Sequence, residues 1–272
     1  METIPPPVMT YIPTATSDER IAWFKKYKKP HLDKLVGLIN PGQEETTHIH
    51  YPDANVIRDF FAKAISDQYS GIRIYFGSNH DASSGRDEKG KLAFIYVPTI
   101  MKGDASHRSS DKYYLSSSRR PLSSIAREEA QQLITNYQSL KLTLLHSTLC
   151  DHDLSNKHGE TKYLFINKEE IVEIRDEITY QLSKPEHGVV GINLYVGAYT
   201  DKEIIHEGKY LSQRLTVHYI FVDKDGKDID LTKIDRRYDI FKEVPIVGGY
   251  NTFDPIPPFP DEDGPSEPGE PI

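Results

Sequence analysis

The stretch Gly71-Ile-Arg-Ile-Tyr-Phe-Gly77 decides the fold, because it returns later in the chain as Gly191-Ile-Asn-Leu-Tyr-Val-Gly197. Four of the seven positions are identical, and two more are apolar in both stretches. Each stretch is a strand-like segment with a glycine at either end. A repeated pattern of this kind indicates either a chance resemblance between two strands or two copies of one module.

The neighbours of the two stretches favour the second interpretation. Ile57-Arg58-Asp59 matches Ile174-Arg175-Asp176 at an offset of 117, and the glycine-bounded strands match at 120. The segments 91–96 and 214–219 match at 123, and a weaker match at 110 places residues 23–27 on 133–137. The order of the elements is kept and the offset grows along the chain, as small loop insertions in the second copy would make it. We therefore predict an internal duplication.

Each copy is predicted to contain a helix, a strand, a second helix, a strand, a hairpin and a further strand, which is an α+β module. The first helix is expected to begin near Thr16, with a capping box, and to end before Pro30. A strand followed by a helix and a neighbouring strand favours a right-handed crossover, and the hairpin adds an antiparallel partner. The predicted fold is therefore a small mixed sheet in each module, covered by helices.

Alternation along the repeated strand assigns its two faces. The apolar positions of the first copy should lie under the second helix of the module, and the same holds for the second copy. Arg73 and Tyr75 should lie on a more open face, as should Asn193 and Tyr195. The apolar positions are Ile72, Ile74, Phe76, Ile192, Leu194 and Val196.

Composition divides the chain into five parts. Residues 1–16 are predicted to be an extended N-terminal tail, residues 17–105 the first module, and residues 106–122 a serine-rich, basic and exposed linker. Residues 123–244 form the second module. Residues 245–272 form a Pro-rich tail that carries six acidic residues and no Lys or Arg, so most of the net charge of −8 belongs to it.

The bulk composition is that of a soluble globular protein. No stretch approaches the roughly 20 apolar residues of a transmembrane helix, and the N-terminal residues do not resemble a signal peptide. Cys150 is the single cysteine, so an internal disulfide is excluded. We expect a cytoplasmic protein without a membrane span.

The chain resembles a group of uncharacterised bacterial proteins that carry a G-(I/L/V)-R-(I/L)-Y strand and a Pro-Pro C-terminal tail. Trp23, Tyr27 and the segment 71–75 carry the resemblance, and the second copy has Asn193 in place of the arginine. The tails of the group often have cysteines beside the Pro-Pro, whereas this chain has Ile256 and Pro260 there. The resemblance implies no activity, and no metal or disulfide role for the tail.

One segment is rich in potential metal ligands, namely His146, Cys150, His152 and His158. His48 and His50, which should point to one face of a strand, could add to them. The spacing matches no known zinc motif, and the alternative is an ordinary polar loop. Cys150 beside a histidine could also act as a nucleophile with its base. No catalytic residue and no cofactor are assigned.

Two other patterns have simple explanations. Asp225-Gly226 follows a strand and is predicted to be a hairpin turn rather than a calcium loop. A basic cluster could contact nucleic acid, but no nucleic-acid-binding signature is present and the body of the chain is not basic, so we expect a solvated helix face and an exposed loop and no nucleic-acid partner. The cluster comprises Lys25, Lys26, Lys28, Lys29, Arg108, Arg119 and Arg120.

The preferred function is that of a non-enzymatic structural or interaction protein that self-associates into an oligomer or filament. Apolar residues of the two tails are spaced to lie along another surface. They include Tyr11, Ile12, Tyr250, Phe253, Ile256 and Phe259. The alternatives are a metal-dependent or Cys/His hydrolase-like enzyme that uses residues 146–158, and a nucleic-acid accessory protein that uses the basic linker.

Overall fold

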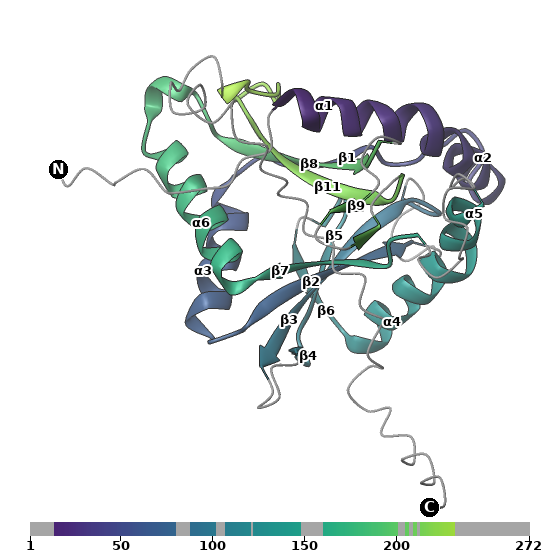
Figure 1. Ribbon diagram of the computed structural model, residues 1–272, viewed down its shortest axis with the longest axis horizontal. Helices are drawn as coiled ribbons and strands as arrows, with labels where there is room; N and C mark the ends of the chain where they lie inside the picture. The colour runs from purple at the N-terminus through teal and green to yellow at the C-terminus, as the bar shows by residue number, and fades with distance from the viewer. Residues whose placement is uncertain are drawn as a thin grey trace, which may run out of the picture.

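The computed structural model describes residues 14–79, 88–101, 107–120, 122–147, 160–200 and 213–231, together with 205–206 and 209–210. The chain has an α+β fold in which helices pack on two antiparallel sheets, which confirms the predicted fold class (Figure 1). In the described part of the chain, no helix has the length and apolarity needed to cross a membrane.

Helices and strands are interspersed along the chain. The helical segments are α1 (Thr14–Trp23), a π-helical turn (Phe24–Lys28), α2 (Lys29–Ile39), α3 (Asn55–Ser66), α4 (Arg127–Asn136), a second π-helical turn (Tyr137–Leu142), α5 (Thr143–His146), α6 (Lys168–Leu182) and a 3-10 turn (Pro185–His187). The strands are β1 (His48–Tyr51), β2 (Gly71–Ser78), β3 (Leu92–Met101), β4 (His107–Ser109), β5 (Tyr113–Ser116), β6 (Ser123–Ile125), β7 (Tyr163–Asn167), β8 (Gly191–Ala198), β9 (Ile205–His206), β10 (Lys209–Tyr210) and β11 (Leu215–Val222).

The two main sheets exchange strands between the two halves of the chain. The small sheet has the order β1-β8-β11, and the large sheet has the order β6-β5-β3-β2-β7, with β4 on β3. In each sheet a strand from one half of the chain therefore pairs with the central strand from the other half, β1 with β8 and β7 with β2. All the described pairings are antiparallel. The predicted crossover between neighbouring parallel strands is wrong, because β1 and β7 leave their own repeat.

The register is the same in both sheets. Gly71 lies opposite Thr99 and Gly191 lies opposite Val222, which reproduces the offsets of 120 and 123 seen in the sequence. Tyr75 pairs with Tyr163. Tyr195, its equivalent, pairs with His48. Strand for strand, β7-β2-β3 in the large sheet is thus equivalent to β1-β8-β11 in the small sheet.

The first helices are exchanged as well. Helix α1 packs on β8, and α4 packs on β2. A Cβ atom added at Gly197 would lie 3.4 Å from Cβ of Arg20, and one added at Gly77 would lie 3.3 Å from Cβ of Leu133. Arg20 is therefore equivalent to Leu133, at an offset of 113. The weak sequence match at 110 is wrong by three residues.

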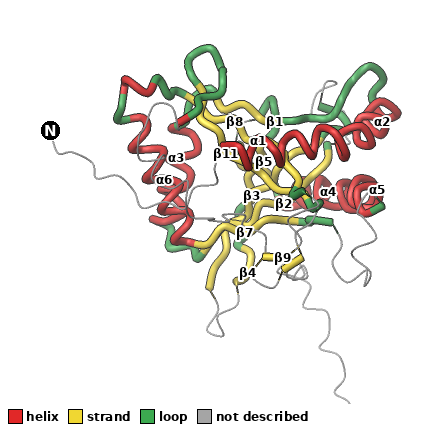
Figure 2. The backbone as a smooth tube through the Cα atoms, turned by 45° about the horizontal axis from the view of Figure 1, so that its top comes forward, coloured by secondary structure: helices red, strands yellow, loops and turns green. Residues whose placement is uncertain are grey.

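Helices α3 and α6, which are equivalent to each other, pack side by side at one end of the molecule (Figure 2). Between the two sheets, the hydroxyl groups of Tyr96 and Tyr219 lie 3.2 Å apart. These tyrosines are equivalent at the offset of 123. The equivalent elements thus meet along a pseudo-twofold axis.

The main core lies between the sheets and under α3 and α6, and it includes the six apolar positions predicted from the repeated strand. The predicted open face is wrong for the first repeat. Arg73 and Tyr75 are buried, because α4 packs on β2 at this face and Arg73 donates to Ser109 of β4 and lies over the Tyr163 ring. A second apolar cluster fills this space, with Tyr75, Ile95, Leu115 and Leu133 among its members.

Two other expectations are also wrong. The segment 106–122 is not an exposed linker, because it supplies β4 and β5 to the large sheet and Ser116 and Ser117 are buried. The first helical segment does not end before Pro30. A π-helical turn precedes α2, and Pro30 occupies the first turn of α2, where its missing N–H costs no helical hydrogen bond.

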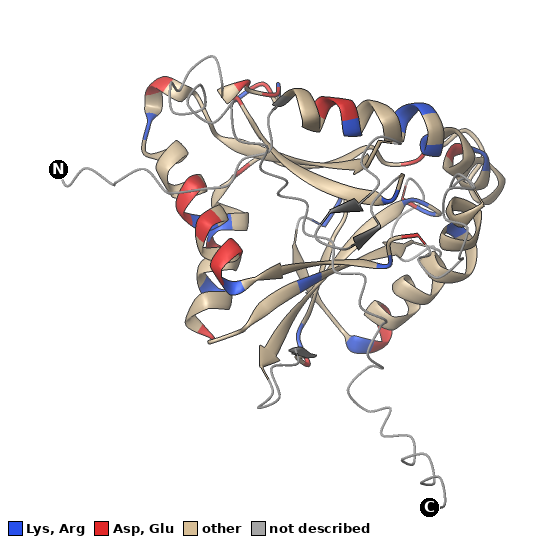
Figure 3. Cartoon of the chain, viewed as in Figure 1, with Lys and Arg blue, Asp and Glu red and all other residues tan. Residues whose placement is uncertain are grey.

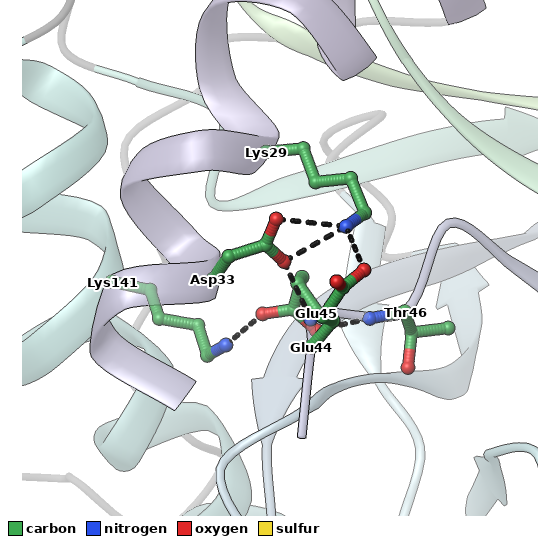
Figure 4. Close-up of polar contacts among 6 residues, drawn as sticks. All are labelled: Lys29, Asp33, Glu44, Glu45, Thr46 and Lys141. Atoms are coloured by element: carbon green, nitrogen blue, oxygen red, sulfur yellow. Dashed lines mark hydrogen bonds and ion pairs between the residues drawn. The ribbon is translucent and has the colours of Figure 1, made fainter. Parts of the chain in front are cut away.

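A buried ion pair joins the two halves of the chain near the end of each π-helical turn. Lys141 donates to Oε2 of Glu45, and both side chains are fully buried (Figure 4). Oε1 of Glu45 accepts the backbone N–H groups of Thr46 (2.8 Å) and Leu92 (2.6 Å). Because Glu45 precedes β1 and Leu92 begins β3, this carboxylate joins the two sheets.

The second ion pair reproduces the first at equivalent positions. Lys28 donates to Oε2 of Glu160 at 2.6 Å, and the two side chains are 2% and 0% exposed. Oε1 of Glu160 accepts the N–H groups of Thr161 (2.8 Å) and Leu215 (2.7 Å). The described atoms therefore give each buried carboxylate one cation and two backbone donors, which is the arrangement that makes burial of an ion pair tolerable.

We expect Lys28→Met and Lys141→Met each to lower the free energy of unfolding by about 3–5 kcal/mol, because each leaves a buried carboxylate without its cation. Urea denaturation followed by circular dichroism measures the loss. Lys63→Met is the matched control, because Lys63 forms an exposed pair with Asp67 and its removal should cost at most about 1 kcal/mol. A loss at Lys28 no larger than that at Lys63 would contradict the structural role of the pair.

Candidate functional site

The face of the small sheet that points away from the core is polar. Ile192, Leu194 and Val196 point into the core, so Asn193 and Tyr195 point outward, beneath and beside α1. We call this surface the outer polar face. It consists of His48, His50, Asn193, Tyr195 and His218, with Arg20 of α1 above it and Asp228 at its edge.

One row of this face crosses all three strands. His48 of β1 lies opposite Tyr195 of β8, which lies opposite His218 of β11. The rings of His48 and Tyr195 are 4.9 Å apart. His48 is exposed, Tyr195 is half-buried and His218 is only 4% exposed. The row therefore runs from solvent to the space beneath α1.

A chain of hydrogen bonds links the exposed part of the face. Nδ1 of His50 lies 2.8 Å from Oδ1 of Asn193, and Nδ2 of Asn193 donates to Oδ1 of Asp228 at 2.9 Å. The Tyr195 hydroxyl donates to Oδ2 of the same carboxylate at 2.8 Å. Asp228 thus holds both outward side chains of β8 in place.

The surroundings of three side chains on this face shift their pKa values away from 7. Burial, followed by the hydrogen bond to Asp228, raises the pKa of Tyr195 to about 12. Burial, with the Arg20 guanidinium nearby, lowers the pKa of His218 to about 3. Burial also lowers the pKa of His48. At pH 7 these three groups are neutral, so they act as hydrogen-bonding groups or lone-pair donors rather than as proton carriers.

The equivalent face of the large sheet is largely apolar, and Arg73, at the position of Asn193, is its buried charged residue. Tyr163 and Phe165 occupy the positions of His48 and His50, Ile95 that of His218, and Leu133 that of Arg20. The same backbone therefore folds with apolar side chains at these positions. Buried polar groups cost stability relative to such apolar side chains. The stability of the fold therefore does not explain why the small sheet has histidines and an arginine at these positions. The sequence analysis missed this contrast. Aligning the two matched segments and comparing the residue types at equivalent positions would have revealed it.

The small sheet also has a short open edge, on the side of β11 away from β8. At one end, the backbone N–H and C=O of Leu215 bond to Glu160 and Thr161. At the other end, the turn after β11 folds back, and Ile229 donates to the carbonyl of Phe221 at 2.8 Å.

Between these ends lie Val217 and Tyr219. Strand alternation directs their backbone N–H and C=O groups to the open side. Within the described ranges no strand pairs with them. The equivalent residues of β3, Phe94 and Tyr96, pair with β5. We call residues 217–219 the open edge.

The sequence-predicted metal ligands are not brought together in the described part of the chain. His146 ends α5, which packs on α2, whereas Cys150, His152 and His158 lie outside the described residues. The described residues contain no group of three or more His, Cys, Asp or Glu that could hold a metal ion. His48 and His50 do share one face of β1, as predicted.

Of the other predicted features, one lies inside the described residues and one lies outside them. Asp225-Gly226 forms the predicted turn, and Gly226 has a positive φ of 75°. The tail residues Tyr11, Ile12, Tyr250, Phe253, Ile256 and Phe259 lie outside the described residues.

The four predicted basic residues of the first helical segment do not share one surface. Lys28 is buried against Glu160, and Lys29 pairs with Asp33 and Glu44. Lys25 and Lys26 are exposed. Figure 3 shows basic and acidic residues distributed over several helices, while the strands carry few charges.

We expect His218 to make the protein sensitive to acid. Its folded-state pKa of about 3 lies below the unfolded value near 6.5, so the unfolded chain binds an extra proton between these values. The stability is present above pH 6.5 and is lost as the pH falls towards 3, at up to about 1.4 kcal/mol per pH unit.

Urea denaturation at pH 7, 6, 5 and 4 measures this slope. His218→Ile, which introduces the residue found at the equivalent Ile95, should make the slope shallower by about one proton. His31→Gln, at an exposed histidine of α2, should leave it unchanged. An equal slope in the wild type and in His218→Ile would show that the buried imidazole is not responsible.

Comparison with protein-family models, with curated proteins and with solved structures finds no match to this chain. The resemblance to the bacterial G-(I/L/V)-R-(I/L)-Y proteins therefore stays a prediction. The function has to be inferred from the contacts described above.

Proposed function

We propose that the protein is a non-enzymatic interaction protein that self-associates by adding a strand to the open edge of β11. The contrast between the two sheets carries this proposal. The edge of β3 is closed by β5 of the same chain, at residues 94–96. The equivalent residues 217–219 have no strand beside them among the described residues.

An open edge of this kind is a template for strand addition, because its backbone groups are already extended and aligned. β5 shows how much strand this position takes, since three of its residues, 114–116, pair with 94–96 of β3. A donor strand of similar length suffices for β11. The side chains of Val217 and Tyr219 are partly buried and pack against the core, so the added strand would extend an existing apolar layer.

The residues that directly follow β11 do not fill the open edge. Continuing the pairing of Asp228 with Val222 would place Leu231 opposite Tyr219, but Leu231 is helical. The proposed donor is therefore the segment 238–244, Tyr-Asp-Ile-Phe-Lys-Glu-Val, of a neighbouring molecule. It contains no proline and mixes apolar with charged residues, which suits an edge strand, whereas the end beyond residue 254 carries seven prolines, each without the N–H group that pairing needs.

Internal duplication belongs to the same proposal. The shared register, the exchanged helices and the two Lys–Glu pairs at equivalent positions all support it. In this view one repeat carries its own closing strands, β4 to β6, and the other repeat receives its closing strand from a second molecule. The pKa values of Tyr195 and His218, which lie far from 7, favour binding over proton-transfer catalysis.

The other candidates remain proposals with less support. A hydrolase-like site in residues 146–158 rests on side chains outside the described residues. Two of the basic residues predicted for a nucleic-acid surface form ion pairs within the chain. Lys28 is buried against Glu160, and Arg120 pairs with Glu129 at 2.8 Å. A cytoplasmic location likewise stays a prediction.

Val217→Pro tests the proposal, because proline removes the outward N–H and its ring blocks an incoming strand, while edge positions tolerate proline. We expect the wild type to form oligomers and Val217→Pro to be monomeric, as measured by size-exclusion chromatography with light scattering. Val217→Ala is the control, because it keeps the N–H and should keep the assembly.

Deletion of residues 238–272 should also give monomers, with the circular dichroism of the remaining fold unchanged. A monomeric wild type would contradict self-association. An oligomer that survives both Val217→Pro and the deletion would show that the molecules associate elsewhere.

A further inference from the structure

We propose that His48 and His50 form a two-imidazole chelate for a divalent transition-metal ion on the outer polar face. They lie two residues apart on β1, and both are exposed while Ile49 and Tyr51 point into the core. Residues i and i+2 of a strand share a face at a separation of about 6.6 Å. The two rings therefore stand side by side and open to solvent.

The hydrogen bonds of the face fix which nitrogen of His50 carries a lone pair. The Asp228 carboxylate only accepts, so the side-chain amide of Asn193 must present its NH₂ group to it. Oδ1 of Asn193 then faces Nδ1 of His50, 2.8 Å away, and can only accept. Nδ1 of His50 therefore carries the hydrogen, and Nε2 presents its lone pair outward.

This arrangement is the usual surrounding of a metal-binding histidine, in which the second ring nitrogen donates to a fixed oxygen. Here Asn193 supplies that oxygen, and Asp228 orients Asn193 in turn. Gly226 lies beside the Nε2 edge of the ring, since an added Cβ would be 3.6 Å from Cε1 and 3.9 Å from Nε2, and its lack of a side chain leaves that space to a bound ion. His50 is thus held ready to bind without a competing side chain from this turn.

His48 completes the pair. Its Nδ1 lies 3.2 Å from the hydroxyl of Thr47, and its ring packs on Tyr195. The charged groups that face it are Asp228, which favours a bound cation, and Lys25, which opposes one. Lys25 is exposed, with its Nζ 5.7 Å from the centre of the Tyr195 ring, and the buried Arg20 lies near His218. Asp228, held by two hydrogen bonds, is the negative charge on the Asn193 side of the face.

Two imidazole ligands suit Zn²⁺, Ni²⁺ and Cu²⁺, and Cu²⁺ should bind most tightly. With two protein ligands, the remaining coordination positions are open to water or to a group from another molecule. The equivalent residues of the large sheet, Tyr163 and Phe165, lack an imidazole. The chelate is therefore specific to the small sheet, and it is independent of strand addition at β11.

The test is titration of the full-length chain with Cu²⁺, followed by calorimetry and electron paramagnetic resonance. The wild type should bind one ion with the signal of two nitrogen ligands. His48→Tyr and His50→Phe, which introduce the residues of the large sheet and so suit the fold, should each weaken binding at least tenfold. Asn193→Ala should weaken it by about 10- to 100-fold through loss of the fixed oxygen. His31→Gln is the control and should bind as the wild type does.

The variant carrying both His152→Gln and His158→Gln separates this chelate from the His-rich segment 146–158, and it should also bind as the wild type does. Loss of the ion in that variant would overturn the proposal. Unchanged binding in either His48→Tyr or His50→Phe would overturn it as well. Circular dichroism of each variant checks that the fold is retained.

Discussion

The two buried Lys–Glu pairs are the interaction on which the rest of the structure depends. Each glutamate stands where the chain enters one sheet, and its carboxylate also accepts a backbone N–H from the first residue of a strand in the other sheet. Each lysine comes from a π-helical turn of the opposite repeat. The pairs therefore fix the two sheets relative to each other and the first helix of each repeat relative to both. A carboxylate buried in this way is stable only when all its partners are present, so the interaction favours the complete fold over its parts.

Much of the fold could be predicted from the sequence, because the repeated strand has a clear alternation and the offset between matching elements changes gradually. The alternation assigns the apolar positions of β2 and β8 to the correct face for that reason. The exchange of β1 and β7 could not be predicted, because a strand carries the same pattern whether it pairs within its repeat or across to the other. The three-residue error at α1 has a related cause. Trp23 and Tyr27 match residues of the second copy by type, whereas packing on Gly197 and Gly77 aligns Arg20 with Leu133.

The candidate site was harder to predict than the fold. The sequence pattern puts His48 and His50 on one face, but their link to Asn193 and Asp228 spans two strands and a turn that are distant in the sequence. The strongest signal is the difference between equivalent faces of one chain. Apart from Arg73, one face is an apolar layer under α4, whereas the other buries His218 and Arg20 under α1. Because the two faces share one backbone geometry, the polar residues that occur only on the small sheet are tolerated by the fold and are not required for its stability.

The exchange of strands has a consequence for biosynthesis. β1 pairs with β8, so His48 leaves the ribosome well before its partner Tyr195 exists. At typical rates of translation the interval is of the order of 10 s. During this time the first half of the chain lacks a partner for β1 and a cation for Glu45, and β2 lacks β7. Folding can finish only when most of the chain has been made, so β1 and β2 stay without these partner strands until then.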